Sequence, residues 1–199
     1  MTELKIPEDM LVEFDERGHI YKHAGEKIPS VTTVLTGTGL VRTFGFTELA
    51  RQKGSAVHRA CQFLDENDLD WDSLDPVVRP YVECYAEFKK LAVFEPLIIE
   101  KPLMLTEPYK ICGTPDRIGL WHGDPCVLDL KTGQKAKWHK YQLAPYAKMA
   151  CRIFGTSTVN RIGVYLAPKG LAKIEVHEND SDFDVFDAAA LVYYSQEGR

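Results

Sequence analysis

The stretch from Ile111 to Lys131 places the strongest constraint on how this chain can fold. It consists of two short apolar runs, 111–121 and 126–131, on either side of the sequence His122-Gly123-Asp124-Pro125. Glycine, aspartate and proline between two apolar runs predict a turn, and the whole stretch therefore predicts a β-hairpin.

Two aspartates and a lysine fall at one end of this hairpin. Asp129 and Lys131 close the second run, and Asp116 stands early in the first. Residues two apart in a strand share a face, so Asp129 and Lys131 project together, and Asp116 can reach the same place across the hairpin. Converging carboxylates repel each other unless a cation lies between them, and oxygen ligands favour Mg²⁺ or Mn²⁺. With a lysine alongside, the set suits metal-assisted hydrolysis of a phosphodiester; the alternative is a surface hairpin with solvated charges.

Composition bounds the class of protein. A chain of 199 residues that is 45% hydrophobic suits one compact domain. No apolar run approaches the length of a membrane span, and the N-terminal residues do not resemble a signal peptide. The five cysteines are odd in number and contain no Cys-x-x-Cys pair, which argues against a disulfide framework or a zinc ribbon. We therefore expect a cytoplasmic protein with reduced cysteines and no membrane association.

Charge is distributed unevenly along the chain. The net charge is −5, yet residues 130–174 contain nine lysines and arginines and no acidic residue. Acidic residues gather instead in 65–75, which we interpret as a solvated loop, and in 175–187. This separation predicts one positive face beside the proposed metal site; the alternative is that the lysines simply solvate a helix.

The spacing of apolar residues predicts the remaining elements. Helices are expected at 46–67, 75–91, 135–154 and 182–195, with Asp75 and Ser181 as N-caps, and strands at 97–105, 160–167 and 170–176. Residues 11–30 predict a small hairpin with turns near Gly18 and Gly25, and Ser30 begins either a helix or a strand. Together these predict an α/β fold with a central mixed sheet of about four or five strands and helices on both faces. We divide this single domain into an N-terminal hairpin and lead-in (1–45), a core (46–167) and a C-terminal strand and helix (168–199).

Four short motifs occur in an order that resembles a known superfamily. Gly54-x-x-x-His58, Thr114-Pro-Asp116, Asp129-Leu-Lys131-Thr-Gly and Gln142-x-x-x-Tyr146 are similar to the motifs of PD-(D/E)XK nucleases. The likeness is greatest to the branch that holds RecB-type nuclease domains, phage-type exonucleases and CRISPR-adaptation nucleases, and it covers residues 28–167. It implies a restriction-endonuclease-like core.

The resemblance also implies roles for individual residues. The implied catalytic residues are Asp116, Asp129, Lys131 and Gln142; the implied metal ligands are His58, Asp116, Asp129 and the Leu130 carbonyl; the implied DNA contacts are Gln142 and Tyr146. The predicted positive face adds Lys135, Lys137 and Lys140 as candidate DNA contacts. Glu100 is either a further metal ligand or a carboxylate paired with Lys101 or Arg117. Trp138 and Tyr141 could stack on bases or pack in the core. Pro145 predicts a kink beside Tyr146, because an interior proline costs a helix about 3 kcal/mol.

The cofactor expected from the resemblance is one or two Mg²⁺ or Mn²⁺ ions, with the imidazole ligand favouring Mn²⁺. The cysteines are not clustered as an iron–sulfur centre of the CRISPR-adaptation type requires, so no such cluster is expected. The implied function is metal-dependent DNA hydrolysis, as an exonuclease in prokaryotic or phage DNA recombination, repair or processing. The alternatives are an endonuclease or a CRISPR-like spacer-end nuclease and, in another class, a non-catalytic DNA-binding or assembly module.

Overall fold

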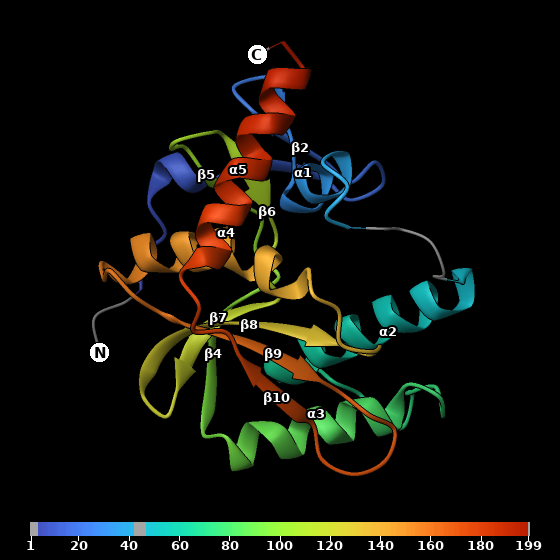
Figure 1. Ribbon diagram of the computed structural model, residues 1–199. Coiled ribbons are helices and arrows are strands. Elements are labelled where there is room, and N and C mark those ends of the chain that lie inside the picture. The colour runs from blue at the N-terminus through green and yellow to red at the C-terminus, as the bar shows by residue number, and fades with distance from the viewer. Residues whose placement is uncertain (1–3, 42–46, 199) are drawn as a thin grey trace.

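A five-stranded sheet forms the centre of the computed structural model, which describes residues 4–41 and 47–198 (Figure 1). The strand order is β10-β9-β8-β7-β4, and only β8 and β9 run parallel. The strands span Phe94–Ile99 (β4), Arg117–Trp121 (β7), Asp124–Lys131 (β8), Asn160–Tyr165 (β9) and Lys173–Val176 (β10). The predicted α/β fold with a mixed sheet is confirmed. The proposed boundary at residues 45 and 46 lies outside the described residues.

Two smaller sheets form separately from the central sheet. The first is a meander of β1 (Glu13–Asp15), β2 (Ile20–His23) and β3 (Glu26–Ile28), so residues 11–30 form three strands rather than one hairpin. The turns at Gly18 and Gly25 are confirmed. The second sheet pairs β5 (Leu103–Leu105) with β6 (Ile111–Gly113).

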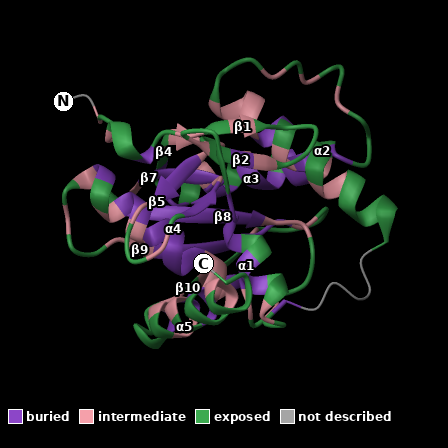
Figure 2. Ribbon diagram, turned by 90° about the horizontal axis from the view of Figure 1, so that it is seen from above, coloured by how far each residue is buried: buried purple, intermediate pink, exposed green. Residues whose placement is uncertain are grey.

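Helices cover both faces of the central sheet (Figures 1 and 2). They span Val31–Gly37 (α1), Glu48–Asp65 (α2), Arg79–Leu91 (α3), His139–Phe154 (α4) and Ser181–Gln196 (α5). Successive side chains of β8 point to opposite faces: Val127 packs with α1, α4 and α5, whereas Leu128 and Leu130 pack with α2 and α3. The central strands are therefore buried on both sides, which explains their nearly continuous apolar sequence. None of the described helices combines the length and the apolar character that crossing a membrane requires.

The helix starts differ from the predicted ones in instructive ways. Asp75 does accept a backbone hydrogen bond, from Val77 N at 2.7 Å, but regular helix begins only at Arg79. Pro80 consequently falls in the first turn of α3, where its missing N–H has no intrahelical partner to lose. Ser181 is the first residue of α5 rather than its cap.

The short segment after Pro29 is helical, which resolves the ambiguity at Ser30. The Ser30 side chain caps α1 by accepting a hydrogen bond from Thr33 N at 3.0 Å. At the other helix near the predicted site, α4 begins at His139, four residues later than expected, and continues through Pro145 to Phe154.

Two stretches predicted as single strands are each broken in two. The 97–105 stretch breaks after Ile99, where Glu100 has φ +45°, and the 111–121 stretch breaks at 114–116. Each break contains a proline, Pro102 or Pro115, which has no N–H for a sheet ladder. Glu100 N donates to the Asp116 carbonyl at 3.1 Å, so the two breaks lie side by side. Two carboxylates are thereby brought together at the end of the central sheet.

Candidate metal centre

His58, Glu100 and Asp116 form a compact group at this end of the sheet. Their ligand atoms all lie within 4.8 Å of one another. His58 Nδ1 is 3.4 Å from Asp116 Oδ1 and 3.8 Å from Glu100 Oε1. The side chains are 28%, 23% and 11% exposed for His58, Glu100 and Asp116, so the group is partly open to solvent. One imidazole and two carboxylates suit a divalent cation.

The path of α2 determines the position of His58. His58 lies on α2 beside the buried stripe that contains Val57 and Cys61. Gly54, one turn earlier, lies against Thr132, whose hydroxyl would be 3.4 Å from an added Cβ. Because α2 passes this close to the chain just after Lys131, its next turn brings His58 over the end of the sheet.

Asp116 is held as an anion. Burial alone would raise the pKa of its carboxyl, but His58 and then Lys131 and Arg117 outweigh burial and lower that pKa to about 2. Asp116 Oδ2 also accepts a hydrogen bond from Leu130 N at 2.6 Å. The N–H and C=O of one strand residue point to the same side, so the Leu130 carbonyl lies on the side of β8 that is next to β7.

Asp116 raises the pKa of both His58 and Glu100, which favours the charged form of the imidazole but the neutral form of the carboxyl. Burial by itself lowers the pKa of His58, but Asp116 and Glu100 raise it to about 10. The pKa of Glu100 is raised by burial first and by the negative charge of Asp116 second. One imidazolium therefore neutralises only part of the charge of two carboxylates.

Asp129 and Lys131 form an adjoining pair rather than joining the compact group. Lys131 Nζ lies 2.6 Å from Asp129 Oδ2 and donates to Gln142 Oε1 at 3.1 Å. The register of β7 and β8 pairs Arg117 with Leu128, so Asp116 and Asp129 are the next residues along their strands. Burial and the charge of Asp116 raise the pKa of Asp129 to about 6, although Lys131 opposes the shift. Asp129 is thus adjacent to the three-residue group, with its carboxylate engaged by Lys131.

Tyr146 lies in the core. It is 4% exposed, and a Cβ added at Gly113 would come within 2.4 Å of its ring. Its ring therefore packs beneath the site, and its contact with DNA stays a prediction. Trp138 and Tyr141 are partly buried against the same core, in agreement with the packing alternative.

The positive face predicted from the lysine-rich stretch is not formed as expected. Residues far away in the sequence place carboxylates against most of these cations. The pairs are Lys135–Glu175 (3.4 Å), Lys140–Asp182 (3.0 Å), Lys148–Asp187 (2.6 Å), Arg152–Asp9 (2.7 Å) and Arg161–Asp182 (3.1 Å). Lys137 is exposed and forms no ion pair with the described residues. Charge that is separated along the chain is largely neutralised by folding.

Sequence reasoning missed a buried ionic network beneath the group. Asp65, which we interpreted as the start of a solvated loop, ends α2 with its side chain 0% exposed. Arg117 is also 0% exposed; its Nε donates to Asp65 Oδ2 and its Nη1 to Glu100 Oε1 at 3.1 Å. The pairing of Glu100 with Arg117 was one of the alternatives for Glu100, and it coexists with the approach to His58. A charged residue inside an apolar strand was the sequence signal for such a network.

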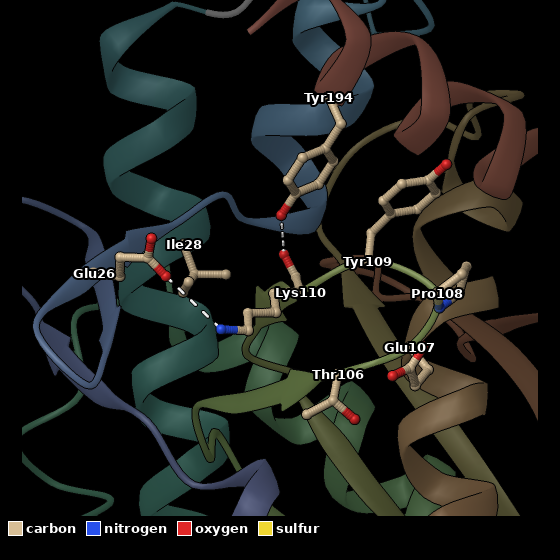
Figure 3. A pocket seen from close by; sticks show the side chains of 8 residues that line it. All are labelled: Glu26, Ile28, Thr106, Glu107, Pro108, Tyr109, Lys110 and Tyr194. Carbon is tan, nitrogen blue, oxygen red and sulfur yellow. Dashed lines mark hydrogen bonds and ion pairs between the residues drawn. The ribbon is translucent and has the colours of Figure 1, made fainter. Parts of the chain in front are cut away.

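A hollow of about 630 Å³ opens onto the group. His58 and Glu100 line it together with Arg59 of α2 and with Phe14 and His19 of the β1–β2 hairpin. A second hollow of about 490 Å³ lies between β3, the 106–110 loop and α5 (Figure 3). There the Tyr109 and Tyr194 rings stack 5.1 Å apart, and Lys110 pairs with Glu26. Of these two hollows, only the first is lined by residues of the His58, Glu100 and Asp116 group and connects that group to solvent.

No family model matches the chain, and a search of curated proteins finds no match.

Proposed function

We propose that this protein is a divalent-metal-dependent deoxyribonuclease of the PD-(D/E)XK type. The observation that carries the proposal is the convergence of the His58, Glu100 and Asp116 group with the Asp129–Lys131–Gln142 chain at one end of the sheet. The two sets come from five segments of the chain, which extend from α2 to α4. A cation-binding group beside a nearly buried ammonium is the arrangement that phosphodiester hydrolysis requires.

The donor set fits a divalent cation. Burial and Asp116 together raise the pKa of Glu100, so the charge of Asp116 disfavours the ionised form of its neighbour. A cation would remove that repulsion. Asp116, Glu100 and His58 would hold it, with the Leu130 carbonyl as a further proposed ligand, and the imidazole favours Mn²⁺ over Mg²⁺. When bound, such an ion supplies Lewis-acid activation of water and neutralises phosphate charge.

The neighbouring residues would act on the phosphate. Lys131 presents an ammonium that is 18% exposed at the end of β8. Asp129 and Gln142 hold this ammonium from two sides, so its direction is fixed before substrate arrives. A fixed cation can donate to a water or to a phosphoryl oxygen and stabilise the charge that develops there. Gln142 and Lys137 are the proposed contacts to the DNA strand.

We propose exonuclease action on DNA ends or single strands, in the cytoplasm of a prokaryotic or phage-infected cell. An endonuclease, including one that trims CRISPR-like spacers, would use the same groups. Closed circular DNA, which has no ends, distinguishes an exonuclease from an endonuclease, because an exonuclease leaves it intact.

The test is incubation of end-labelled single- and double-stranded DNA with Mg²⁺, Mn²⁺ or EDTA. We expect cleavage with Mn²⁺ or Mg²⁺ and none with EDTA. Asp129→Ala and Lys131→Ala should reduce cleavage by about 10²-fold or more, while Lys169→Ala, a change in the 168–170 turn segment, should leave it unchanged. DNA binding without cleavage under every metal condition would instead indicate a binding or assembly module.

A further inference from the structure

One fully buried cation beside the metal centre has no part in the proposed chemistry. Arg117 follows Asp116 directly and is 0% exposed. Its Nη1 donates both to Glu100 Oε1, at 3.1 Å, and to the Asp116 carbonyl, at 2.5 Å. A single guanidinium therefore contacts the main chain of one candidate ligand and the side chain of another.

Asp65 fixes the opposite side of this guanidinium. Its carboxylate accepts from Arg117 Nε, from Tyr85 Oη at 2.9 Å and from Lys89 Nζ at 2.5 Å. Buried ionic pairs are seldom more stabilising than apolar residues of similar volume, because both ions lose their hydration. A fully buried Arg117–Asp65 pair is therefore weak evidence for stability, whereas it does hold the guanidinium in one fixed direction.

Glu100 is the ligand whose direction depends most on such support. It lies just beyond the end of β4, at φ +45°, and its side chain is 23% exposed at the hollow described above. Neither a helix nor a strand restricts its rotamers on that side. The hydrogen bond from Arg117 is the contact that turns the carboxylate inward, to within 3.8 Å of His58 Nδ1.

We propose that Arg117, anchored by Asp65, is a positioning residue that orients the Glu100 carboxylate and so sets the affinity of the centre for a divalent cation. The inference rests on the proposed function, because it requires the centre to bind a metal. Groups that orient metal ligands typically change metal affinity about 10- to 100-fold when they are altered.

The test is a calorimetric titration of the metal-free protein with Mn²⁺, without DNA. Arg117→Lys keeps the charge but removes the fork that reaches Glu100 and Asp65 together. We expect its Kd for Mn²⁺ to rise about tenfold or more. Arg161→Lys is the matched control: Arg161 is also buried, 3% exposed, and pairs with Asp182 at 3.1 Å, away from the centre. Its Kd should equal that of the wild type even if the Tm falls.

A second pair of variants separates positioning from a general effect on folding. If Arg117 acts through Glu100, the double variant Arg117→Lys/Glu100→Gln should bind Mn²⁺ no more weakly than Glu100→Gln alone. Additive losses would overturn the inference, as would an unchanged Kd in Arg117→Lys. Should Arg117→Lys fail to fold, Asp65→Asn, which keeps the side-chain volume, provides the same comparison. A wild type that binds no Mn²⁺ would contradict the proposed function itself, whereas a binding wild type with an equally tight Arg117→Lys would contradict only this inference.

Discussion

The two halves of the site treat similar carboxylates in opposite ways. Asp116 directly precedes β7 and Asp129 lies near the end of β8, one step beyond the Arg117–Leu128 pair, and both are buried, at 8% and 2% exposed. Yet the pKa of Asp116 is lowered to about 2, whereas that of Asp129 is raised to about 6. Burial raises the pKa of both carboxyls. The neighbouring His58 imidazolium outweighs burial at Asp116, whereas at Asp129 the Lys131 ammonium is opposed by the negative charge of Asp116.

The difference suggests that the two halves of the site have different roles. The half formed by His58, Glu100 and Asp116 concentrates negative charge and opens to solvent, as a cation site requires. The half formed by Asp129, Lys131 and Gln142 holds an ammonium in place. Each prediction below tests whether the two halves can be separated in this way.

The largest effect is expected for Asp116→Asn. This change removes the anion that contacts both His58 and the Leu130 amide. We expect Mn²⁺ binding to be lost in calorimetry and kcat/KM for DNA cleavage to fall by about a thousandfold, the range for removal of a preorganised charge-stabilising group. Undiminished Mn²⁺ binding would show that the cation site lies elsewhere.

Lys131→Ala should impair only the half of the site formed by Asp129, Lys131 and Gln142. We expect cleavage to fall by about 10²- to 10³-fold, because the ammonium facing the phosphate is gone. The Kd for Mn²⁺ should not rise, since Lys131 is not a ligand and its positive charge does not attract the ion. If Lys131→Ala lost Mn²⁺ binding as completely as Asp116→Asn, the two halves would form one inseparable unit.

The affinity for Mn²⁺ should increase with pH. In the folded protein the pKa of His58 is about 10, so its imidazolium stabilises the fold fully below about pH 6.5, the usual histidine value, and this stabilisation is lost as pH rises through about 10. A histidine must be neutral to bind a metal, so binding releases a proton over this window. Titrations in buffers of different ionisation enthalpy measure that proton. His58→Gln should bind more weakly, with a flatter pH dependence; equal proton release by this variant would refute the assignment.

Asp129→Asn should stabilise the protein at neutral pH while it impairs cleavage. The folded pKa of about 6 exceeds the unfolded value of about 3.9, so the ionised carboxylate reduces stability as pH rises from about 4 to about 6. The gain at pH 7 is at most about 3 kcal/mol, less the loss of the Lys131 pair. Thermal unfolding at pH 4 and pH 7 measures it. A variant that is less stable than the wild type at pH 7 would contradict the claim that ionised Asp129 destabilises the fold.

The smallest effect compares two lysines near the start of α4. Lys137 is exposed without an ion pair among the described residues, whereas Lys140 is held by Asp182 at 3.0 Å. We expect Lys137→Ala to reduce the slope of log Kd against log salt for DNA binding by about one, and Lys140→Ala to change it less. Equal slopes for the two variants would indicate that the Asp182 pair opens when DNA binds.

Local patterns were sufficient to predict the hairpin and the convergence of Asp116 with Asp129 and Lys131. The turn at His122-Gly123 and the two-residue alternation of β8 involve only neighbouring residues. The same is true of the α2 stripe, which begins to place His58. These predictions depend on periodicity, which a single sequence displays directly.

Long-range ionic pairing could not be predicted from the same patterns. Arg117 and Asp65 are 52 residues apart, and Arg152 and Asp9 are 143 apart. A solvated acidic loop and a buried acidic helix end have the same local sequence, so Asp65 was misplaced. The positive face was misjudged for the same reason, because a stretch without acids can still fold against carboxylates from another part of the chain.

The most direct test of the central claim is a crystal structure of the protein grown or soaked with Mn²⁺, with anomalous data collected for manganese. The account predicts an anomalous peak within coordination distance of His58, Glu100 and Asp116. Full-occupancy Mn²⁺ bound elsewhere, with none of these three side chains coordinating it, would contradict it.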